Sequence, residues 1–200
     1  MIIAIDTIKL VSAVFAIILV IFGAFLPYLR DILVKKTKPH AYTWLIWTIT
    51  QGVALAGLLY GKGGWGSLSF FIMTAFVFIT FLVSLKYGTR NITKFDTTIL
   101  IIALLSIIVW RQMQNPLLAV FIVSAIDFLG YLPSFRKTFE EPWTETVTSW
   151  LVFSFTNILI IFSLSEYNFL TLTYLITITI GNIILITICL IRRQVIPANK

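Results

Sequence analysis

The chain has 200 residues, of which 59% are hydrophobic and only 12% are charged, and its formal net charge is +7. An ordinary soluble domain is roughly a quarter charged, so this composition argues against a water-soluble globular protein. The positive residues lie in short connectors between apolar runs, where we expect them to orient helices in a membrane and not to bind nucleic acid. Cys189 is the only cysteine, which excludes an intramolecular disulfide.

Seven apolar runs follow one another along the chain, most of them close to the length that crosses a bilayer. We expect an all-α membrane protein with transmembrane helices at Ile8–Pro27, Tyr42–Tyr60, Ser67–Leu85, Thr97–Trp110, Pro116–Leu132, Val147–Leu164 and Phe169–Ile191. The fourth run is the shortest, and Asp96 and Arg111 bracket it. The first run is too long for a signal peptide and has no basic segment before it, so we expect it to remain as a helix.

The distribution of lysine and arginine predicts the orientation. All but three of the 15 lie in alternate connectors or in the C-terminal tail: Arg30, Lys35, Lys36, Lys38, Lys86, Arg90, Lys94, Arg136, Lys137, Arg192, Arg193 and Lys200. The other three are Lys9, Lys62 and Arg111. The positive-inside rule then places the N-terminus outside and the C-terminus in the cytoplasm, which requires an odd number of crossings.

An internal repeat emerges when the sequence is shifted against itself by 106 residues. The rarer residue types that pair are Pro27 with Pro133, Arg30 with Arg136, Trp44 with Trp150, and Gln51 with Asn157. The shift spans four crossings, so the two halves would be parallel and related by an axis along the membrane normal. We therefore expect a triple-helix bundle at 1–90, a linker helix at 91–114 and a second bundle at 115–200, a three-plus-one-plus-three plan.

The end of the first run and the basic connector from Leu29 to His40, followed by an aromatic-rich helix, resemble the PQ-loop and SWEET superfamily of membrane transporters. This resemblance implies the same three-plus-one-plus-three plan, with the first helix of each half ending in proline on the cytoplasmic side. The glutamine of the family's Pro-Gln motif is replaced by Tyr28 in the first half and by Ser134 in the second. The stretch from Lys38 to Trp47 also resembles a group of bacterial membrane proteins, so the bacterial inner membrane is the expected location.

Asp127 is the strongest single candidate for a functional residue, because an ionised carboxylate within hydrocarbon costs several kcal/mol or more. It should face the bundle interior, as a proton-coupling or substrate-binding group or as a hydrogen-bonded structural residue. Gln51, Asn157 and Asn182 are candidate contacts for a polar solute, although such amides can also bridge helices. Pro27 and Pro133 would act as hinges or simply end their helices.

The remaining candidates lie near the cytoplasmic ends of the helices. Trp44, Trp47 and Trp150 would either anchor the protein at the membrane interface or stack on a substrate. Arg30 and Lys35 would pair with Glu141 and Glu145 across the two halves to form an inner gate, unless these charges are simply solvated. Gly57 and Gly61 have the spacing of a close helix contact, which would join two copies of the chain as a homo-oligomer.

The sequence contains no metalloprotease motif, no phosphate-binding glycine loop and no nucleophile elbow, and His40 is its only histidine. We therefore expect no enzyme activity, no metal and no cofactor. The predicted function is transport of a small polar solute by alternating access, with a site near the midplane between the halves. The alternative is a membrane receptor or assembly factor with the same fold that transports nothing.

Overall fold

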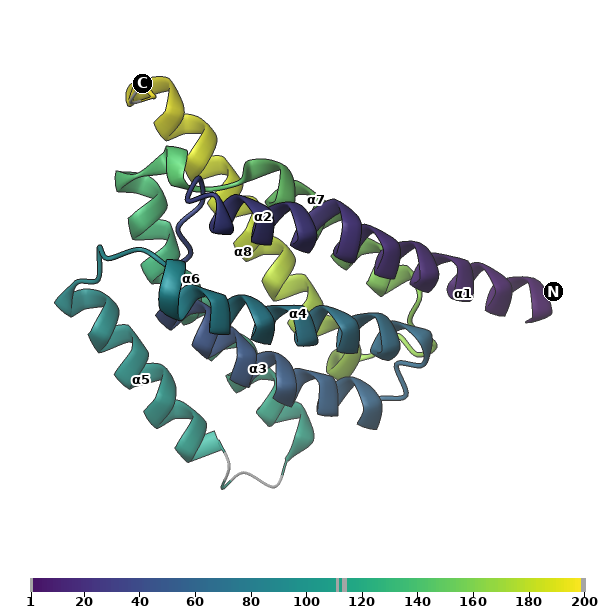
Figure 1. The fold of residues 1–200 in the computed structure, drawn as a ribbon. Helices are drawn as coiled ribbons and strands as arrows, with labels where there is room; N and C mark the ends of the chain where they lie inside the picture. The colour runs from purple at the N-terminus through teal and green to yellow at the C-terminus, as the bar shows by residue number, and fades with distance from the viewer. Residues whose placement is uncertain (1, 111, 113–114, 199–200) are drawn as a thin grey trace.

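The structure is a computed structural model that describes residues 2–110, 112 and 115–198. Arg111, Lys200 and the predicted end of the linker at 114 lie outside these residues. Within them the chain is all-helical, and the elements are α1 Ile2–Ile18, the π-helix η1 Leu19–Phe25, α2 Leu26–Leu33, α3 Ala41–Tyr60, α4 Trp65–Tyr87, α5 Lys94–Trp110, α6 Pro116–Glu140, the short 3-10 helix η2 Pro142–Thr144, α7 Val147–Phe162 and α8 Phe169–Val195 (Figure 1).

Five stretches of the described chain are long and apolar enough to cross a membrane. They are Ile5–Leu33, Ala41–Tyr60, Trp65–Tyr87, Leu117–Glu140 and Phe169–Val195. The expectation of an all-α membrane protein is therefore supported. The helices α5 and α7 have 17 and 16 residues, which at 1.5 Å per residue falls short of a hydrocarbon core of about 30 Å. Seven crossings stays a prediction.

The first rod is continuous from α1 through η1 to α2, so the expectation that Pro27 ends the first helix is wrong. Pro27 follows directly on the π-helix, in the first turn of α2. A proline lacks the N–H of the usual hydrogen bond and its ring crowds the preceding turn, and the wider turn of a π-helix relieves that crowding. Pro133 likewise lies inside α6, which continues beyond the predicted end at Leu132 to Glu140.

The helices form two groups, and these groups also pack against each other. In the first group α4 packs on α1 and α3, and in the second α8 packs on α6 and α7. Between the groups, α1 and η1 pack on α7, while α3 packs on α6. The helix α5 lies at the edge of the bundle against α6 and α3, with Ile46, Ala103 and Ile126 buried in a small apolar cluster (Figure 1).

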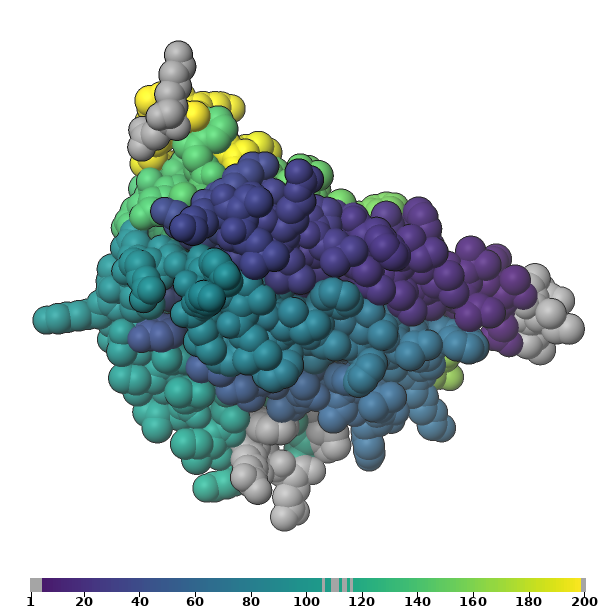
Figure 2. Space-filling view, viewed as in Figure 1, coloured from purple at the N-terminus to yellow at the C-terminus, as the bar shows by residue number. Residues whose placement is uncertain are grey.

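The connectors gather at two ends of the bundle. At the end that we call the basic end, the connectors 34–40, 88–93 and 141–146 contact one another, and Arg193 of α8 donates to the Glu145 carbonyl. At the opposite end, the Lys9 ammonium donates to the Ser165 carbonyl, and the N-terminal turns of α1 project past the other helices (Figures 1 and 2). Among the described residues, the basic side chains predicted to share one side therefore do lie at one end.

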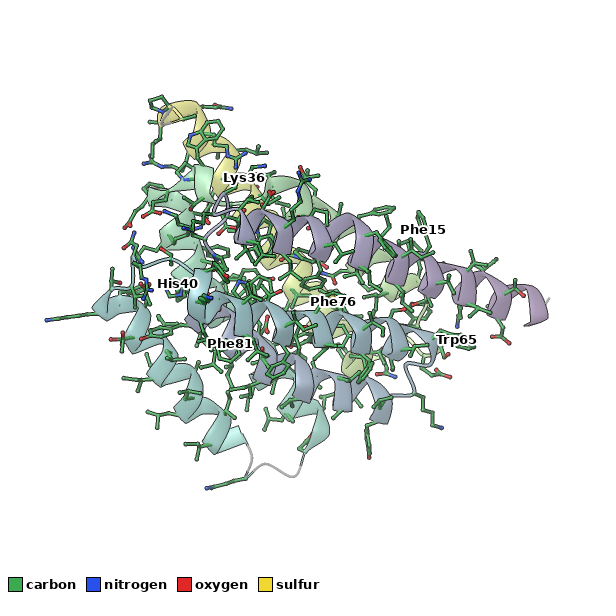
Figure 3. All side chains as sticks on the ribbon, in the orientation of Figure 1. Phe15, Lys36, His40, Trp65, Phe76 and Phe81 are labelled. Carbon is green, nitrogen blue, oxygen red and sulfur yellow. The ribbon has the colours of Figure 1, made fainter. Side chains whose placement is uncertain are left out.

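The outer surface is apolar along the helices. Large hydrophobic side chains stay exposed there, including Phe15 at 47% and Phe22 at 65%, and Phe15 points away from the bundle (Figure 3). The buried interior instead combines aromatic rings with polar groups such as Asp127 and Asn157. This inverse arrangement is expected where the surrounding solvent is hydrocarbon.

Candidate functional site

A small cavity lies at the centre of the bundle, where the two groups of helices meet. Side chains from η1, α3, α4, α6, α7 and α8 surround it: Phe25, Trp44, Trp47, Gln51, Met73, Val77, Tyr131, Trp150, Phe153, Ile178 and Asn182. Its volume is about 20 Å³. Since one water needs about 10–15 Å³ of such space, the cavity has room for a single water molecule.

The three tryptophans form much of the wall of this cavity. Trp44, Trp47 and Trp150 are only 2–3% exposed. The rings of Trp44 and Trp47 lie 5.2 Å apart between centroids, and those of Trp47 and Trp150 lie 5.9 Å apart. The interpretation of these residues as interface anchors is therefore wrong. They enclose the centre of the bundle.

The predicted amides divide into two cases. Gln51 and Asn182 line the cavity, and the Asn182 Oδ1 accepts a hydrogen bond of 2.7 Å from the Tyr131 hydroxyl. Asn157 is fully buried but does not line it. The Gln51 Oε1 and both polar atoms of the Asn157 side chain have no hydrogen-bond partner in the described part of the chain. Buried polar groups are normally paired, so these atoms are available to a bound molecule.

Asp127 is fully buried, as its position within an apolar run predicts. Its Oδ1 accepts hydrogen bonds from the hydroxyls of Thr50 and Tyr174, while its Oδ2 has no partner among the described residues. The carboxyl group does not line the cavity, but the two are linked through Trp47. This side chain forms part of the cavity wall, and its Nε1 donates to the Asp127 carbonyl at 3.3 Å.

Thr50 and Tyr174 were not among the predicted site residues. A buried carboxylate requires hydrogen-bond donors, so hydroxyl groups on the neighbouring helices could have been considered as its partners. The hydroxyl groups that reach Asp127 are those on the faces of α3 and α8 that turn toward α6. The sequence does not show which faces these are, because both helices are hydrophobic all round.

The predicted ion pairs of the inner gate are wrong. Glu145 pairs instead with Lys137 of its own half, at 2.7 Å between Oε1 and Nζ, and both side chains are almost fully buried. Its Oε2 accepts from the Trp150 Nε1 at 3.0 Å and from the Tyr28 hydroxyl at 3.5 Å. In the described part of the chain Arg30 and Lys35 form no ion pair.

The two halves nevertheless meet at the basic end through other groups. The Lys38 N–H donates to the Thr144 carbonyl at 3.2 Å. The hydroxyls of Thr37 and Thr146 are hydrogen-bonded, and Thr146 also donates to Asp31 at 2.8 Å. Together with the hydrogen bond from Tyr28 to Glu145, these contacts join the two halves at this end of the bundle. They are hydrogen bonds, whereas the sequence predicted salt bridges here.

The halves are joined at the opposite end as well. The Ser165 N–H donates to the Gly63 carbonyl at 3.3 Å, and the Asn168 side chain donates to the Gly61 carbonyl at 3.2 Å. Connectors 61–64 and 163–168 therefore contact one another directly, one from each half. The two halves are therefore joined at both ends of the bundle.

A second polar cluster is centred on Asp96. It was not predicted from the sequence, because there Asp96 only bounds the fourth apolar run. Asp96 is fully buried and receives two hydrogen bonds from the Arg136 guanidinium, at 3.0 and 2.6 Å. The His40 Nε2 lies 3.3 Å from the same carboxylate, and burial of the imidazole lowers the pKa of His40. This cluster fastens α5 to α6 and to the connector before α3.

The described residues contain no group of three or more His, Cys, Asp or Glu side chains that could hold a metal ion. Comparisons with protein families, with curated proteins and with solved structures find no match for this chain. The functional argument therefore depends on the geometry of the chain itself.

Proposed function

We propose that this chain is a carrier for a small polar solute, built on the three-plus-one-plus-three plan of PQ-loop and SWEET-like proteins and working by alternating access. The central cavity carries the proposal. It lies between the two groups of helices, it has aromatic rings in its wall and unpaired amide groups in or near it, and the halves are joined by contacts at both ends of the bundle. Separating one set of contacts at a time would open the cavity to one side.

The packing supports the repeat on which this plan depends. The first rod of one half packs on the second helix of the other, α1 and η1 on α7 and likewise α6 on α3. Two aromatic contacts repeat at the 106-residue shift. Phe25 meets Phe153 at 4.6 Å between centroids, and Tyr131 meets Trp47 at 4.5 Å. Seven crossings with the C-terminus in the cytoplasm remain part of the proposal, as do the hinge roles of Pro27 and Pro133.

Asp127 is the ionisable element of this proposal. It is fully buried, with one oxygen bonded by two hydroxyl groups and one unpartnered. Protonation of the unpartnered oxygen would remove the charge without breaking the bonds to Thr50 and Tyr174. Gain and loss of that proton would alter the position of Trp47 through the Asp127 backbone, and so couple protonation to the cavity.

The direct test is solute flux in proteoliposomes that contain the full chain. A panel of radiolabelled amino acids, monosaccharides and polyols is offered with and without an inward proton gradient. We expect uptake of at least one solute to respond to the gradient, and the response to disappear in Asp127→Asn. Asp6→Asn is the matched control, since Asp6 is an exposed carboxylate on α1.

A second outcome would support the alternative. Saturable binding of a solute without flux, weakened by Gln51→Leu, would indicate a receptor or assembly factor that uses the same cavity. If neither binding nor flux is found for any member of the panel, and Asp127→Asn changes only the stability of the protein, then Asp127 is a structural residue and the carrier proposal is overturned.

A further inference from the structure

A separate pocket opens on the basic end of the bundle, away from the central cavity. Four basic side chains line it: Lys35 and Lys38 from the connector before α3, Lys86 from the last turn of α4, and Arg90 from the connector before α5. Its volume is about 290 Å³, and Tyr87, Gly88, Thr89, Asn91 and Glu141 complete its lining. The proposed transport function does not use this pocket.

The positive charge of the pocket is neutralised only in part from within. None of the four basic side chains forms an ion pair in the described part of the chain. The single carboxylate in the lining, Glu141, accepts a hydrogen bond of 3.1 Å from the Asn91 side chain. With four basic side chains against one carboxylate, the lining has a net positive charge, and a concave charged surface concentrates the electric field, so this pocket attracts anions.

The backbone beneath the pocket is closely packed. The Thr89 N–H donates to the Pro39 carbonyl at 2.9 Å. A Cβ atom at Gly88 would lie 2.7 Å from that same carbonyl oxygen, so only glycine permits this approach. Lys35 adopts a left-handed φ of +60° just after the end of α2, a conformation more typical of glycine. The segments that carry the basic side chains are thus held together by main-chain contacts.

Exposed apolar side chains next to the pocket indicate that it lies at the edge of the hydrocarbon layer. Leu33 and Leu85, each close in sequence to a pocket lysine, are 56% and 60% exposed, and Leu82 one turn earlier on α4 is 49% exposed. The helices α2 and α4 pack against each other. The pocket therefore lies where an apolar surface meets a basic one, which in a membrane is the level of the lipid headgroups.

We propose that this pocket binds a phosphate group, supplied by the headgroup of an anionic phospholipid whose acyl chains lie against Leu82, Leu85 and Leu33. Lysine and arginine side chains are the usual ligands of a phosphate diester. Because the pocket joins two connectors of the first half to Glu141 of the second, a lipid bound there would hold the closed basic end together. The binding site itself stands independently of the transport proposal.

The test compares two lipids and two pairs of substitutions. The full chain, purified in a neutral detergent, is titrated with phosphatidylglycerol or with phosphatidylcholine of identical acyl chains, and separately with inorganic phosphate at constant ionic strength. Lys38→Gln with Arg90→Gln removes two charges from the pocket. Lys36→Gln with Lys94→Gln removes two exposed charges from the same end without touching the lining. Binding is followed by native mass spectrometry and by the thermal unfolding midpoint.

We expect saturable binding of phosphatidylglycerol over phosphatidylcholine. At about 1 kcal/mol for each basic residue near an anionic lipid, the pocket pair should weaken it roughly 30-fold, and the control pair should change it little. If the pocket pair does not fold, Lys86→Gln alone should give a loss of about fivefold. Binding of inorganic phosphate without preference between the lipids would support the phosphate site and reject its lipid source. Equal losses in both pairs, or no anion preference, would overturn the proposal.

Discussion

Residues that are 106 positions apart occupy corresponding places in the packing of the two halves but differ in polarity. In the first half Phe25 stacks on Phe76, with 5.1 Å between ring centroids. In the second half the corresponding pair is Tyr131 and Asn182, joined by a hydrogen bond of 2.7 Å. The position that corresponds to Asp127 is Ile21. One half thus supplies an apolar wall, whereas the other carries most of the polar groups.

The same contrast holds for the charged residues at the basic end. Asp31 forms a surface pair with Lys36, whose side chain is 67% exposed. The residue 106 positions after Asp31 is Lys137, and its pair with Glu145 is almost fully buried. Similar helix packing therefore tolerates very different electrostatics, and the stability and the chemistry should both depend more strongly on the second half.

The largest expected effect is at the buried ion pair. Lys137→Met should lower the free energy of unfolding by about 3–5 kcal/mol, because it leaves the Glu145 carboxylate buried without its counter-charge. Lys36→Met, which removes the surface pair, should change it by no more than about 0.5 kcal/mol. Both are measured by denaturant unfolding in mixed micelles. Similar losses in the two variants would contradict the difference between the halves.

The next effect concerns the approach of α6 to α8. A Cβ atom at Gly181 would lie 2.5 Å from the Tyr131 ring, so Gly181→Ala should cost about 1–3 kcal/mol through overpacking. The corresponding residue in the first half, Ala75, is exposed. Gly52→Ala is the control, since a Cβ there meets no atom within 4 Å. It should be neutral or slightly stabilising in the same unfolding measurement.

A smaller effect is expected from exchanging the polarity of the two corresponding pairs. Tyr131→Phe leaves the Asn182 oxygen without its donor, and Phe25→Tyr buries a hydroxyl group beside Phe76. Each should cost about 1–2 kcal/mol. Adding Phe76→Asn to Phe25→Tyr should recover part of the loss, if the first half can form the same hydrogen bond. A double variant no more stable than the sum of its single changes would show that the halves differ in backbone geometry as well.

The smallest effect is a pH dependence from the connectors. His40 in the first connector corresponds to Thr146 in the second. Burial lowers the pKa of His40, an effect opposed by the nearby Asp96 carboxylate and reinforced by Arg136 and Lys137. The unfolded chain therefore takes up a proton more readily than the folded one, so stability should decrease as the pH falls through about 6.5. His40→Gln should reduce this decrease in unfolding curves recorded between pH 8 and 5.

Several helix bounds could be predicted well from the sequence, because charges, glycine and polar residues end those apolar runs. The predicted range Tyr42–Tyr60 differs from α3 by one residue, and α8 begins at the predicted Phe169. The error at Pro27 has a physical cause. Whether a proline ends a helix depends on the hydrogen-bond pattern of the turn before it, and the π-helix at Leu19–Phe25 leaves no signature in residue type.

The candidate site could be predicted in part. The interior position of Asp127 follows from the cost of its charge, and Trp44, Trp47 and Gln51 have the spacing of one helix face, which does line the cavity. Interhelical partners are another matter, because they depend on the rotation of each helix about its axis. For this reason the roles of Tyr174 and Asp96 could not be predicted, and the predicted partners of Glu145 were wrong.

The small size of the central cavity has a consequence for protons. A space for one water, walled largely by aromatic rings, cannot hold a file of water molecules. Without such a file, a proton finds no chain of hydrogen bonds to follow through the cavity. In the form described, the central cavity would therefore carry no proton leak, however many copies of the protein a membrane contains.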